Sequence, residues 1–376
     1  MADAVVWRSR HGESWCPRQD SNLRTRLRRA MLYPLSYGGR VGSGRWARCS
    51  VAASGTLAAR HTAPVIVVAG ECLVDLIPAA DGMLRPVLGG GPFTAARAAG
   101  RLGAEVAFLG TLSTDGHGRR ARESLADSGV TDRWAPATDD PTTLAAVDLT
   151  TGDAARYLFY TGGTSAPALT AADTAPALAA APAALVVGTL GLVLEPCADT
   201  LAALVGQVAR DCLVVVDPNC RPAALTGPGA EDRYRERLGH VLGRADVVKV
   251  STEDLDFLSP GVPAAEAARS MAVEHDTLVL LTDGSRGVRV QTPTASVAVD
   301  VPRVTVVDTV GAGDSFVGGF VASWTAAGVP AAGLRDLDPA GALLTAVRYG
   351  VAVAAVTGTR VGADPPTTAE VRAGAG

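Results

Sequence analysis

Short apolar runs alternate with helical stretches through most of the chain, and this alternation restricts the fold more than any other feature of the sequence. Each run is four to six residues long and consists largely of Val, Leu, Ile and Ala. Such runs are typical of strands buried on both faces, with helices that bring successive strands into parallel. The alternation therefore predicts a three-layer α/β/α fold with a mostly parallel central sheet. The expected strands are residues 65–70, 106–110, 185–188, 213–217, 247–250 and 278–282, and the expected helices are residues 95–102, 119–128, 198–210, 233–243 and 264–274.

Two regions depart from this alternation. Residues 143–149 and 155–160 have alternating apolar and polar faces and flank the turn sequence Thr-Thr-Gly-Asp, which predicts a β-hairpin. Residues 84–88 form another short extended piece. We expect these pieces to form a small β-sheet that stands off the main sheet and acts as a lid over a site. This lid would comprise about residues 77–90 and 142–162.

The beginning of the chain differs from the rest. Residues 1–64 contain 11 Arg and 3 acidic residues and show no sustained helical or strand periodicity. Residues 15–24 and 34–39 resemble the conceptual translation of a transfer-RNA gene. We therefore expect residues 1–60 to be a disordered or mis-annotated leader, and residues 61–372 to form the folded domain.

Charge and composition exclude several classes of function. Residues 65–376 carry 23 of the 34 basic and 35 of the 38 acidic side chains, and such an acidic body argues against a nucleic-acid partner. No segment approaches the ~20 apolar residues that cross a bilayer, so we expect no membrane span. The six cysteines show no paired spacing, as is typical of thiols in a reducing cytoplasm. The only lysine, Lys249, precedes Val250, which excludes a Walker-type phosphate loop.

The segment Asp-Thr-Val-Gly-Ala-Gly-Asp-Ser-Phe at residues 308–316 carries the strongest chemical signal. Gly311 and Gly313 permit a tight turn, and a helix-length apolar stretch follows them. The backbone N–H groups of residues 311–314 would then lie at a helix N-terminus, which favours a phosphate group. Asp314 would repel phosphate, but it makes sense as a base that takes a proton from an attacking hydroxyl. The alternative interpretation is a strand-to-helix turn with an Asp N-cap.

Other polar residues follow the predicted strands. Because the carboxyl ends of parallel strands meet at one edge of a sheet, ligands collect there. Each of these segments taken singly is typical of a cap or a turn, but together they predict a site at this edge. They include Asp75, the Gly89-Gly90-Gly91-Pro92 turn before Thr94 and Arg97, residues 217–221, residues 249–253 and residues 282–284.

Residues 89–103 and 308–320 resemble the two characteristic segments of the ribokinase family of carbohydrate kinases, also called the PfkB family. The resemblance extends in register over residues 65–372, and the Asp-Pro-Asn-x-Arg segment at 217–221 and residues 360–366 add to it. It implies a ribokinase-like fold and an enzyme that transfers a phosphoryl group from ATP to a hydroxyl of a small sugar.

The resemblance also implies roles for individual residues. Asp314 would be the general base, and the backbone of Gly311, Ala312, Gly313 and Asp314 would form an anion hole for the transferred group. The sugar would be bound by Asp75, Gly90, Gly91, Thr94, Asn219 and Arg221, and the nucleotide by Lys249, Ser251, Thr282, Gly284 and Gly287. Mg²⁺ would be held through water with Glu253 nearby, and a monovalent cation, K⁺, would be held by the backbone near Asp308, Val310, Arg360 and Gly362.

The identity of the substrate stays open at this stage. Position 94 is usually Asn in the family, and here it is Thr94 preceded by Phe93. The pattern Glu71-x-x-x-Asp75-x-x-Pro78 is most similar to fructokinases, which makes fructose the first choice. The alternatives are a 2-keto-3-deoxygluconate kinase, a ribokinase, and a catalytically idle sugar-binding regulatory relative. The expected partners are the sugar, ATP and a second copy of the chain in a homodimer formed through the lid.

Overall fold

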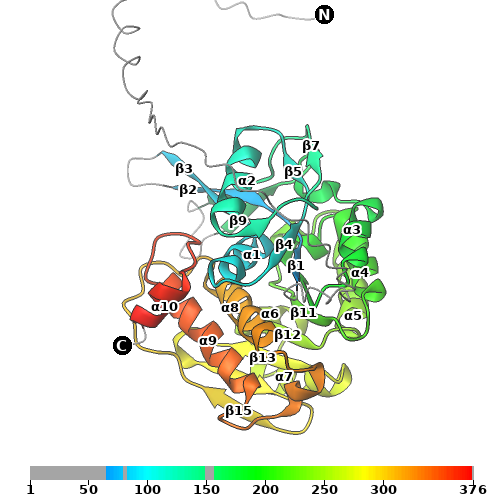
Figure 1. Cartoon of the computed structure of the whole chain (residues 1–376). Coiled ribbons are helices and arrows are strands. Elements are labelled where there is room, and N and C mark those ends of the chain that lie inside the picture. Colours follow the sequence, from blue (N-terminus) through cyan, green and yellow to red (C-terminus); the bar gives the residue numbers. More distant parts are fainter. Residues whose placement is uncertain (1–64, 79–82, 149–155, 375–376) are drawn as a thin grey trace, which may run out of the picture. The chain divides into compact units, whose positions relative to one another are not determined.

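The computed structural model describes residues 65–78, 83–148 and 156–374 (Figure 1). The expected leader at residues 1–60 lies outside the described residues. The described residues belong to one compact unit, His61–Gly376.

The main sheet has nine strands in the order β15-β14-β13-β12-β11-β10-β1-β4-β6. The strands from β13 to β6 are parallel, whereas β14 and β15 extend the sheet in antiparallel fashion. The mostly parallel sheet is therefore confirmed, and the antiparallel edge was not predicted. The strands are β1 (Ile66–Ala69), β4 (Val106–Leu109), β6 (Val130–Thr131), β10 (Ala184–Gly188), β11 (Leu213–Asp217), β12 (Val247–Ser251), β13 (Leu278–Thr282), β14 (Val288–Gln291) and β15 (Ser296–Val299).

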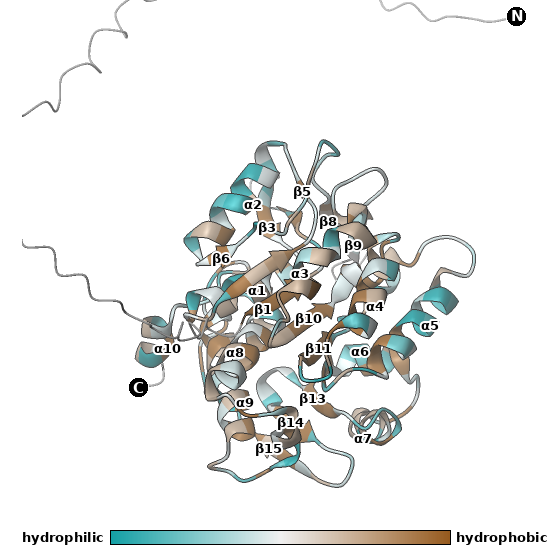
Figure 2. Ribbon diagram, turned by 45° about the vertical axis from the view of Figure 1, so that its right-hand side comes forward, coloured by the Kyte–Doolittle hydropathy of each residue, from teal (hydrophilic) through white to brown (hydrophobic). Residues whose placement is uncertain are grey.

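Helices cover both faces of this sheet, and alternate residues of one strand meet the two layers. Ile66 and Val68 of β1 face the core beneath α1, α2, α8 and α9, whereas Val67 and Ala69 face the core beneath α3 to α7. Figure 2 shows the buried strands in brown at the centre and teal outer surfaces on α2 and α5. The helices are α1 (Gly91–Arg101), α2 (Gly116–Asp127), α3 (Ala175–Ala179), α4 (Cys197–Gln207), α5 (Ala230–Leu242), α6 (Thr252–Leu258), α7 (Ala264–Glu274), α8 (Ala312–Ala327), α9 (Ala342–Thr357) and α10 (Thr368–Gly374).

A second sheet of four strands has the order β3-β2-β8-β9. Its β8 and β9 are antiparallel, which confirms the predicted hairpin, although the hairpin tip at residues 149–155 lies outside the described residues. The parallel pairing of β2 with β8 joins the hairpin to the segment that follows β1. The strands are β2 (Leu73–Pro78), β3 (Leu84–Gly89), β8 (Leu144–Asp148) and β9 (Arg156–Tyr160), and a separate small pair is formed by β5 (Leu112–Ser113) and β7 (Ala137–Thr138).

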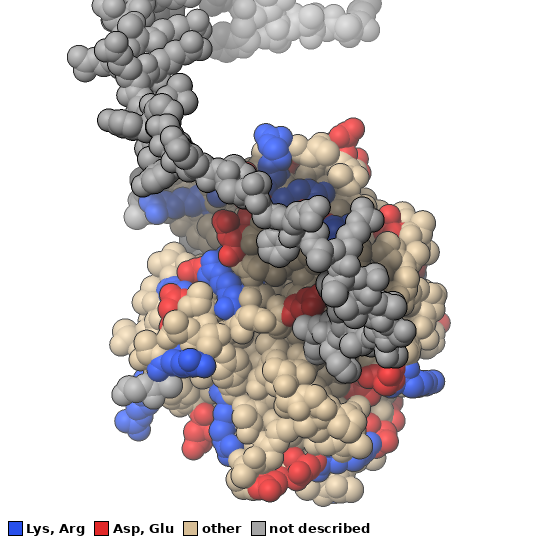
Figure 3. Space-filling model, viewed as in Figure 1, with Lys and Arg blue, Asp and Glu red and all other residues tan. Residues whose placement is uncertain are grey.

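Acidic and basic side chains are mixed over the described part of the face in Figure 3. Among the described residues, no helix is both long enough and apolar enough to cross a bilayer. The carboxyl ends of β1, β10, β11, β12 and β13 share one edge of the main sheet, because these strands are parallel. This is the edge at which the sequence predicts a site.

Candidate active site

A cavity of about 420 Å³ lies at this edge, with residues of the second sheet on its far wall. Its wall includes the start of α1, the start of α8, the loop after β11, the end of β12, and one face of β2 and β9. Most of the residues predicted from the sequence line it. These are Asp75, Gly90, Gly91, Thr94, Asn219, Arg221, Lys249, Ser251, Glu253, Val310, Gly311, Gly313 and Asp314.

The remaining predicted residues lie outside this cavity wall. Thr282 is the register partner of Ser251 on the neighbouring strand, and Gly284 begins η5 (Gly284–Arg286), two residues beyond the end of β13. Asp308 joins two loops, since its carboxylate accepts hydrogen bonds from the N–H groups of Val310 at 3.0 Å and Gly362 at 2.8 Å. The predicted residues outside the wall are Ala312, Thr282, Gly284, Gly287, Asp308, Arg360 and Gly362.

Asp314 lies in the first turn of α8. Gly311 is the N-cap of this helix with a φ of 74°, a left-handed conformation that glycine adopts without strain. Burial raises the pKa of the Asp314 carboxyl, while the positive charges of Lys249 and Arg221 act in the opposite direction. A carboxylate poised in this way, next to the N–H groups of a helix start, can accept a proton from a hydroxyl bound beside it.

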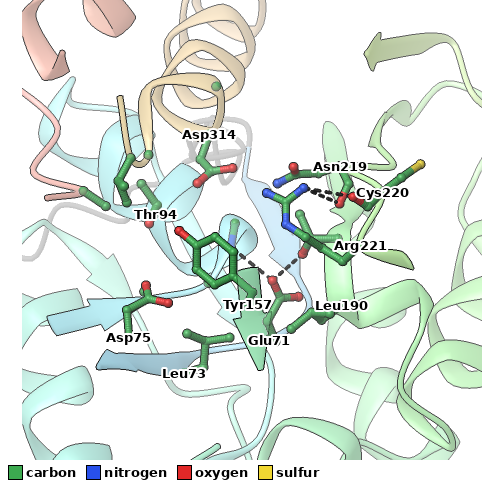
Figure 4. A pocket seen from close by; sticks show the side chains of 18 of the residues that line it. Glu71, Leu73, Asp75, Thr94, Tyr157, Leu190, Asn219, Cys220, Arg221 and Asp314 are labelled. Carbon is green, nitrogen blue, oxygen red and sulfur yellow. Dashed lines mark hydrogen bonds between the residues drawn. The ribbon is translucent and has the colours of Figure 1, made fainter. Parts of the chain in front are cut away.

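Asp75 and Arg221 also point into the cavity, as Figure 4 shows. Burial, and after it the charge of Asp314, raise the pKa of Asp75 to about 6, while the positive charge of Arg221 acts in the opposite direction. The Nη1 atom of Arg221 donates to the backbone carbonyls of Asn219 at 3.2 Å and Cys220 at 3.0 Å. The remaining N–H groups of the guanidinium have no hydrogen-bond partner within the described part of the chain, so they can bind a ligand.

Thr94 lies in the first turn of α1 and is 1% exposed. Its Oγ1 atom is buried and has no hydrogen-bond partner among the described residues. An unpaired buried hydroxyl costs free energy unless a ligand supplies the partner. The position of this hydroxyl on the cavity wall therefore suits a polar ligand atom.

Glu71 is a further member of the site. It had not been predicted as a site residue and occurs in the sequence pattern Glu71-x-x-x-Asp75-x-x-Pro78. Its carboxylate accepts hydrogen bonds from the N–H groups of Gly91 at 3.1 Å and Gly191 at 2.8 Å, and from the hydroxyl of Thr189. Burial raises its pKa to about 7. A Cβ atom at Gly91 would come within 3.1 Å of Asp314 Oδ1, so Glu71 fixes a backbone segment that touches the expected base.

The second sheet contributes aromatic residues that were not predicted as site residues. Tyr157 and Phe159 of β9 line the cavity, and their rings stack with centroids 6.0 Å apart. Figure 4 shows the Tyr157 ring projecting into the cavity. Leu158 and Tyr160 have their side chains exposed, as the alternation of a strand requires. This alternation was visible in the sequence, but it did not reveal which face meets the cavity.

Two neighbouring acids at the start of α6 have different environments. Asp254 is buried and accepts hydrogen bonds from the N–H of Cys220 at 2.6 Å and from the N–H and hydroxyl of Ser251 at 2.7 and 2.8 Å. Glu253 is exposed on the cavity rim, and within the part of the chain that the structure describes only the hydroxyl of Thr252 donates to it, at 3.2 Å. Glu253 is therefore the carboxylate of this pair that remains available to a cation.

Comparisons with known proteins agree with this geometry. The profile of the pfkB family of carbohydrate kinases matches residues 64–370. A fructokinase of Rhizobium leguminosarum bv. trifolii is 35% identical over 263 residues, which cover 69% of this chain and 79% of that protein. The crystal structure of a Xylella fastidiosa fructokinase with bound ATP has a TM-score of 0.74 at 28% identity, covering 83% of this chain and 98% of that chain. A Vibrio cholerae O395 fructokinase double mutant with bound fructose, ADP and potassium ion has a TM-score of 0.71 at 27% identity, with the same coverage.

Proposed function

This chain belongs to the pfkB family of carbohydrate kinases, and we propose that it transfers the γ-phosphoryl group of ATP to a hydroxyl group of fructose. The observation that carries this proposal is the half-buried Asp314 carboxylate beside the N-terminal amides of α8 on the cavity wall. The related structures with bound ATP, ADP and fructose support the choice of both substrates.

The phosphate side, defined as residues 311–314, Lys249 and the Asp217 carboxylate that pairs with Lys249 behind the cavity wall, would carry the chemistry. Asp314 takes the proton of the sugar hydroxyl as that oxygen forms a bond to the γ-phosphorus. The bond from the γ-phosphorus to the bridging oxygen breaks, and ADP leaves. The amides of the α8 N-terminus donate hydrogen bonds to the phosphoryl oxygens, whose negative charge they stabilise.

The sugar side of the cavity, defined as Asp75, Thr94 and Tyr157, supports a neutral sugar. Asp75 can accept hydrogen bonds from sugar hydroxyls, and the Thr94 hydroxyl is the unpaired group described above. A sugar acid such as 2-keto-3-deoxygluconate would bring a second negative charge close to Asp75. The positive charge of Arg221 already acts on the carboxylates of Asp75 and Asp314, so it is not available to neutralise the carboxylate of a sugar acid. This charge argument places fructose ahead of the sugar acid, and the fructose bound in the related Vibrio cholerae structure supports fructose over ribose.

Mg²⁺ is proposed as the divalent cation that accompanies ATP. Among the described residues, no group of three or more His, Cys, Asp or Glu side chains is arranged to hold a metal ion. This fits Mg²⁺, which keeps several waters and commonly uses one or two carboxylates with the substrate phosphates. Glu253 on the cavity rim would be that carboxylate.

K⁺ is proposed as the monovalent cation near Asp308. Both oxygens of this carboxylate already accept backbone N–H groups, from Val310 and Gly362, so the cation would be held by backbone oxygens of the two loops. The loop that follows residue 360 also contacts α1, because Arg97 Nη1 donates to the carbonyl of Ala363 at 3.0 Å. Ordering of these loops would stabilise the anion-binding start of α8.

The second sheet is proposed to close over the bound sugar and to form a homodimer contact. Its outer surface exposes Leu84 at 51%, Leu158 at 46% and Tyr160 at 56% of their areas, and a second copy of the chain would cover such a patch. Sedimentation of the purified protein checks this. A monomer at micromolar concentration would exclude the dimer.

The function is tested by a coupled assay of ADP release with ATP and a panel of fructose, ribose and 2-keto-3-deoxygluconate. We expect sugar-dependent turnover with the highest kcat/KM for fructose. Calorimetry on the same panel tests the alternative of a catalytically idle relative. Sugar binding without turnover would show that the chain is a sugar-binding protein and not a kinase.

A further inference from the structure

Lys249 is buried at the carboxyl end of β12, where only 5% of the residue is exposed. Its Nζ lies 3.1 Å from Asp217 Oδ2 and 3.3 Å from Asp217 Oδ1. Among the described residues, these are the only polar contacts of the ammonium, which has three N–H donors. At least one N–H group is therefore available on the cavity wall that Lys249 lines.

The ammonium also packs against the start of α8. A Cβ atom at Gly313 would come within 3.0 Å of Lys249 Nζ and 3.6 Å of its Cε, so the lysine occupies the space in which a side chain would stand. A helix N-terminus carries partial positive charge, and the ammonium beside it adds to the positive potential that favours an anionic ligand at this position. This arrangement is built for a negatively charged group at the amides of residues 311–314.

We propose that Lys249 is a catalytic residue that contacts the phosphoryl group during its transfer and completes the anion hole together with the Gly313 amide. The proposal rests on the kinase function proposed above and deepens it. Lys249 keeps its proton throughout. Asp314 receives the proton of the hydroxyl, the new P–O bond forms as the bond to ADP breaks, and the ammonium stabilises the negative charge on the phosphoryl oxygens during this exchange.

Asp217 has a supporting part in this arrangement. Burial raises its pKa to about 6, and the nearby ammonium opposes that rise. Its carboxylate holds Nζ toward α8 and balances the buried charge in the absence of phosphate. Removing Lys249 alone would leave Asp217 unpaired in a buried place, which destabilises a protein independently of catalysis.

The kinetic test therefore uses both Lys249→Met and the double variant Lys249→Met/Asp217→Asn, which removes the unpaired carboxylate. We expect the double variant to fold and to have a kcat lower by about 10²–10³-fold, with KM for ATP within a few-fold of the wild type. Arg244→Met is the matched control. It removes a largely buried cation that is paired with Asp246 at 3.0 Å, and Arg244 does not line the cavity.

The proposal is overturned if the folded double variant keeps a kcat within a few-fold of the Arg244→Met control. It is equally overturned if ATP affinity, measured by calorimetry, falls while kcat is unchanged, because Lys249 would then stabilise bound ATP and the transition state equally. A lower kcat with unchanged affinity supports it.

A second arm needs no sugar, so it separates this proposal from the choice of substrate. Lys249 is the only lysine of the chain, and pyridoxal 5′-phosphate carries a phosphate beside an aldehyde that forms an imine with an amine. After reduction with borohydride, peptide mass spectrometry should find the adduct at Lys249, and ATP should prevent it. An adduct at Lys249 that ATP does not prevent overturns the phosphate contact. If ATP prevents labelling but the protein phosphorylates none of the sugars, the contact between Lys249 and phosphate is supported. The proposed kinase function is then contradicted.

Discussion

The phosphate side and the sugar side of the cavity are built in different ways. On the phosphate side Lys249 is paired with Asp217 before any ligand arrives, and the free amides of α8 follow from the helix itself. On the sugar side the Thr94 hydroxyl has no partner among the described residues, and Tyr157 comes from a small separate sheet. The phosphate side is preorganised, which suits a reaction step that is the same for every sugar. The sugar side has an unpaired hydroxyl, which suits discrimination between sugars.

The largest effect is expected on the phosphate side. Asp314→Asn removes the proton acceptor and keeps the size of the side chain, so kcat should fall by about 10²–10⁴-fold. Calorimetry should show ATP and fructose affinities close to those of the wild type. Asp211→Asn, at an exposed position away from the cavity, is the control. A kcat within a few-fold of this control would mean that Asp314 is not the base.

Glu71 lies on the wall of the same cavity, and its substitution should change how the free energy of unfolding depends on pH. Its pKa of about 7, raised by burial from 4.5, means that the folded protein holds this proton over a range in which the unfolded chain has released it. The free energy of unfolding contributed by Glu71 should therefore fall as pH rises from 4.5 to 7, by about 3 kcal/mol.

Urea denaturation at pH 5 and pH 8 measures this effect. Glu71→Gln cannot titrate, so its stability should fall less over this interval than that of the wild type. Glu123→Gln, an exposed matched change on α2, should behave like the wild type. Parallel pH profiles of the wild type and Glu71→Gln would show that Glu71 is ionised in the folded protein at both pH values.

A smaller effect is expected at Thr94. Thr94→Val removes the unpaired hydroxyl and keeps the shape of the side chain, so stability should be unchanged or slightly higher. The Michaelis constant for fructose should rise up to about tenfold, since one hydrogen bond is worth ~0.5–1.5 kcal/mol. Thr94→Asn, which introduces the amide usual in the family, should shift the preference among sugars. Unchanged constants in both variants would mean that Thr94 does not contact the sugar.

The smallest effect is expected from the monovalent cation. Replacing Na⁺ by K⁺ at matched ionic strength should raise kcat a few-fold, because ordered loops at Asp308 and Gly362 would hold the start of α8 in place. Equal rates in the two salts would contradict the proposed K⁺ site and would not affect the account of the phosphate side.

The sequence predicted the features that depend on local patterns. Apolar runs of strand length located β1, β4 and β10 to β13, and the spacing of Gly311, Gly313 and Asp314 located the helix start at the cavity. It did not reveal α9, because residues 342–357 are apolar on nearly all sides and lack the periodicity of a helix with one buried face. The antiparallel β14 and β15 were also missed.

The contacts of Glu71, Tyr157 and Asp254 could not be predicted in this way. Each joins segments far apart in the chain, such as Glu71 with Gly191 and Asp254 with Cys220. Such pairs depend on how the strands are ordered in the sheet, which periodicity does not give. A buried Glu and a lone Tyr in a strand have no local pattern that separates a site residue from a core residue.

The most direct test of the difference between the two sides is the ratio of kcat/KM for fructose to that for ribose, measured in Asp314→Asn and in Tyr157→Phe. Asp314 acts on the step common to all sugars, so its substitution should lower both constants equally and leave the ratio unchanged. Tyr157→Phe removes a hydroxyl on the sugar side and should change the ratio while kcat stays close to that of the wild type. A ratio that changes in Asp314→Asn and stays constant in Tyr157→Phe would contradict the division of the site into a phosphate side and a sugar side.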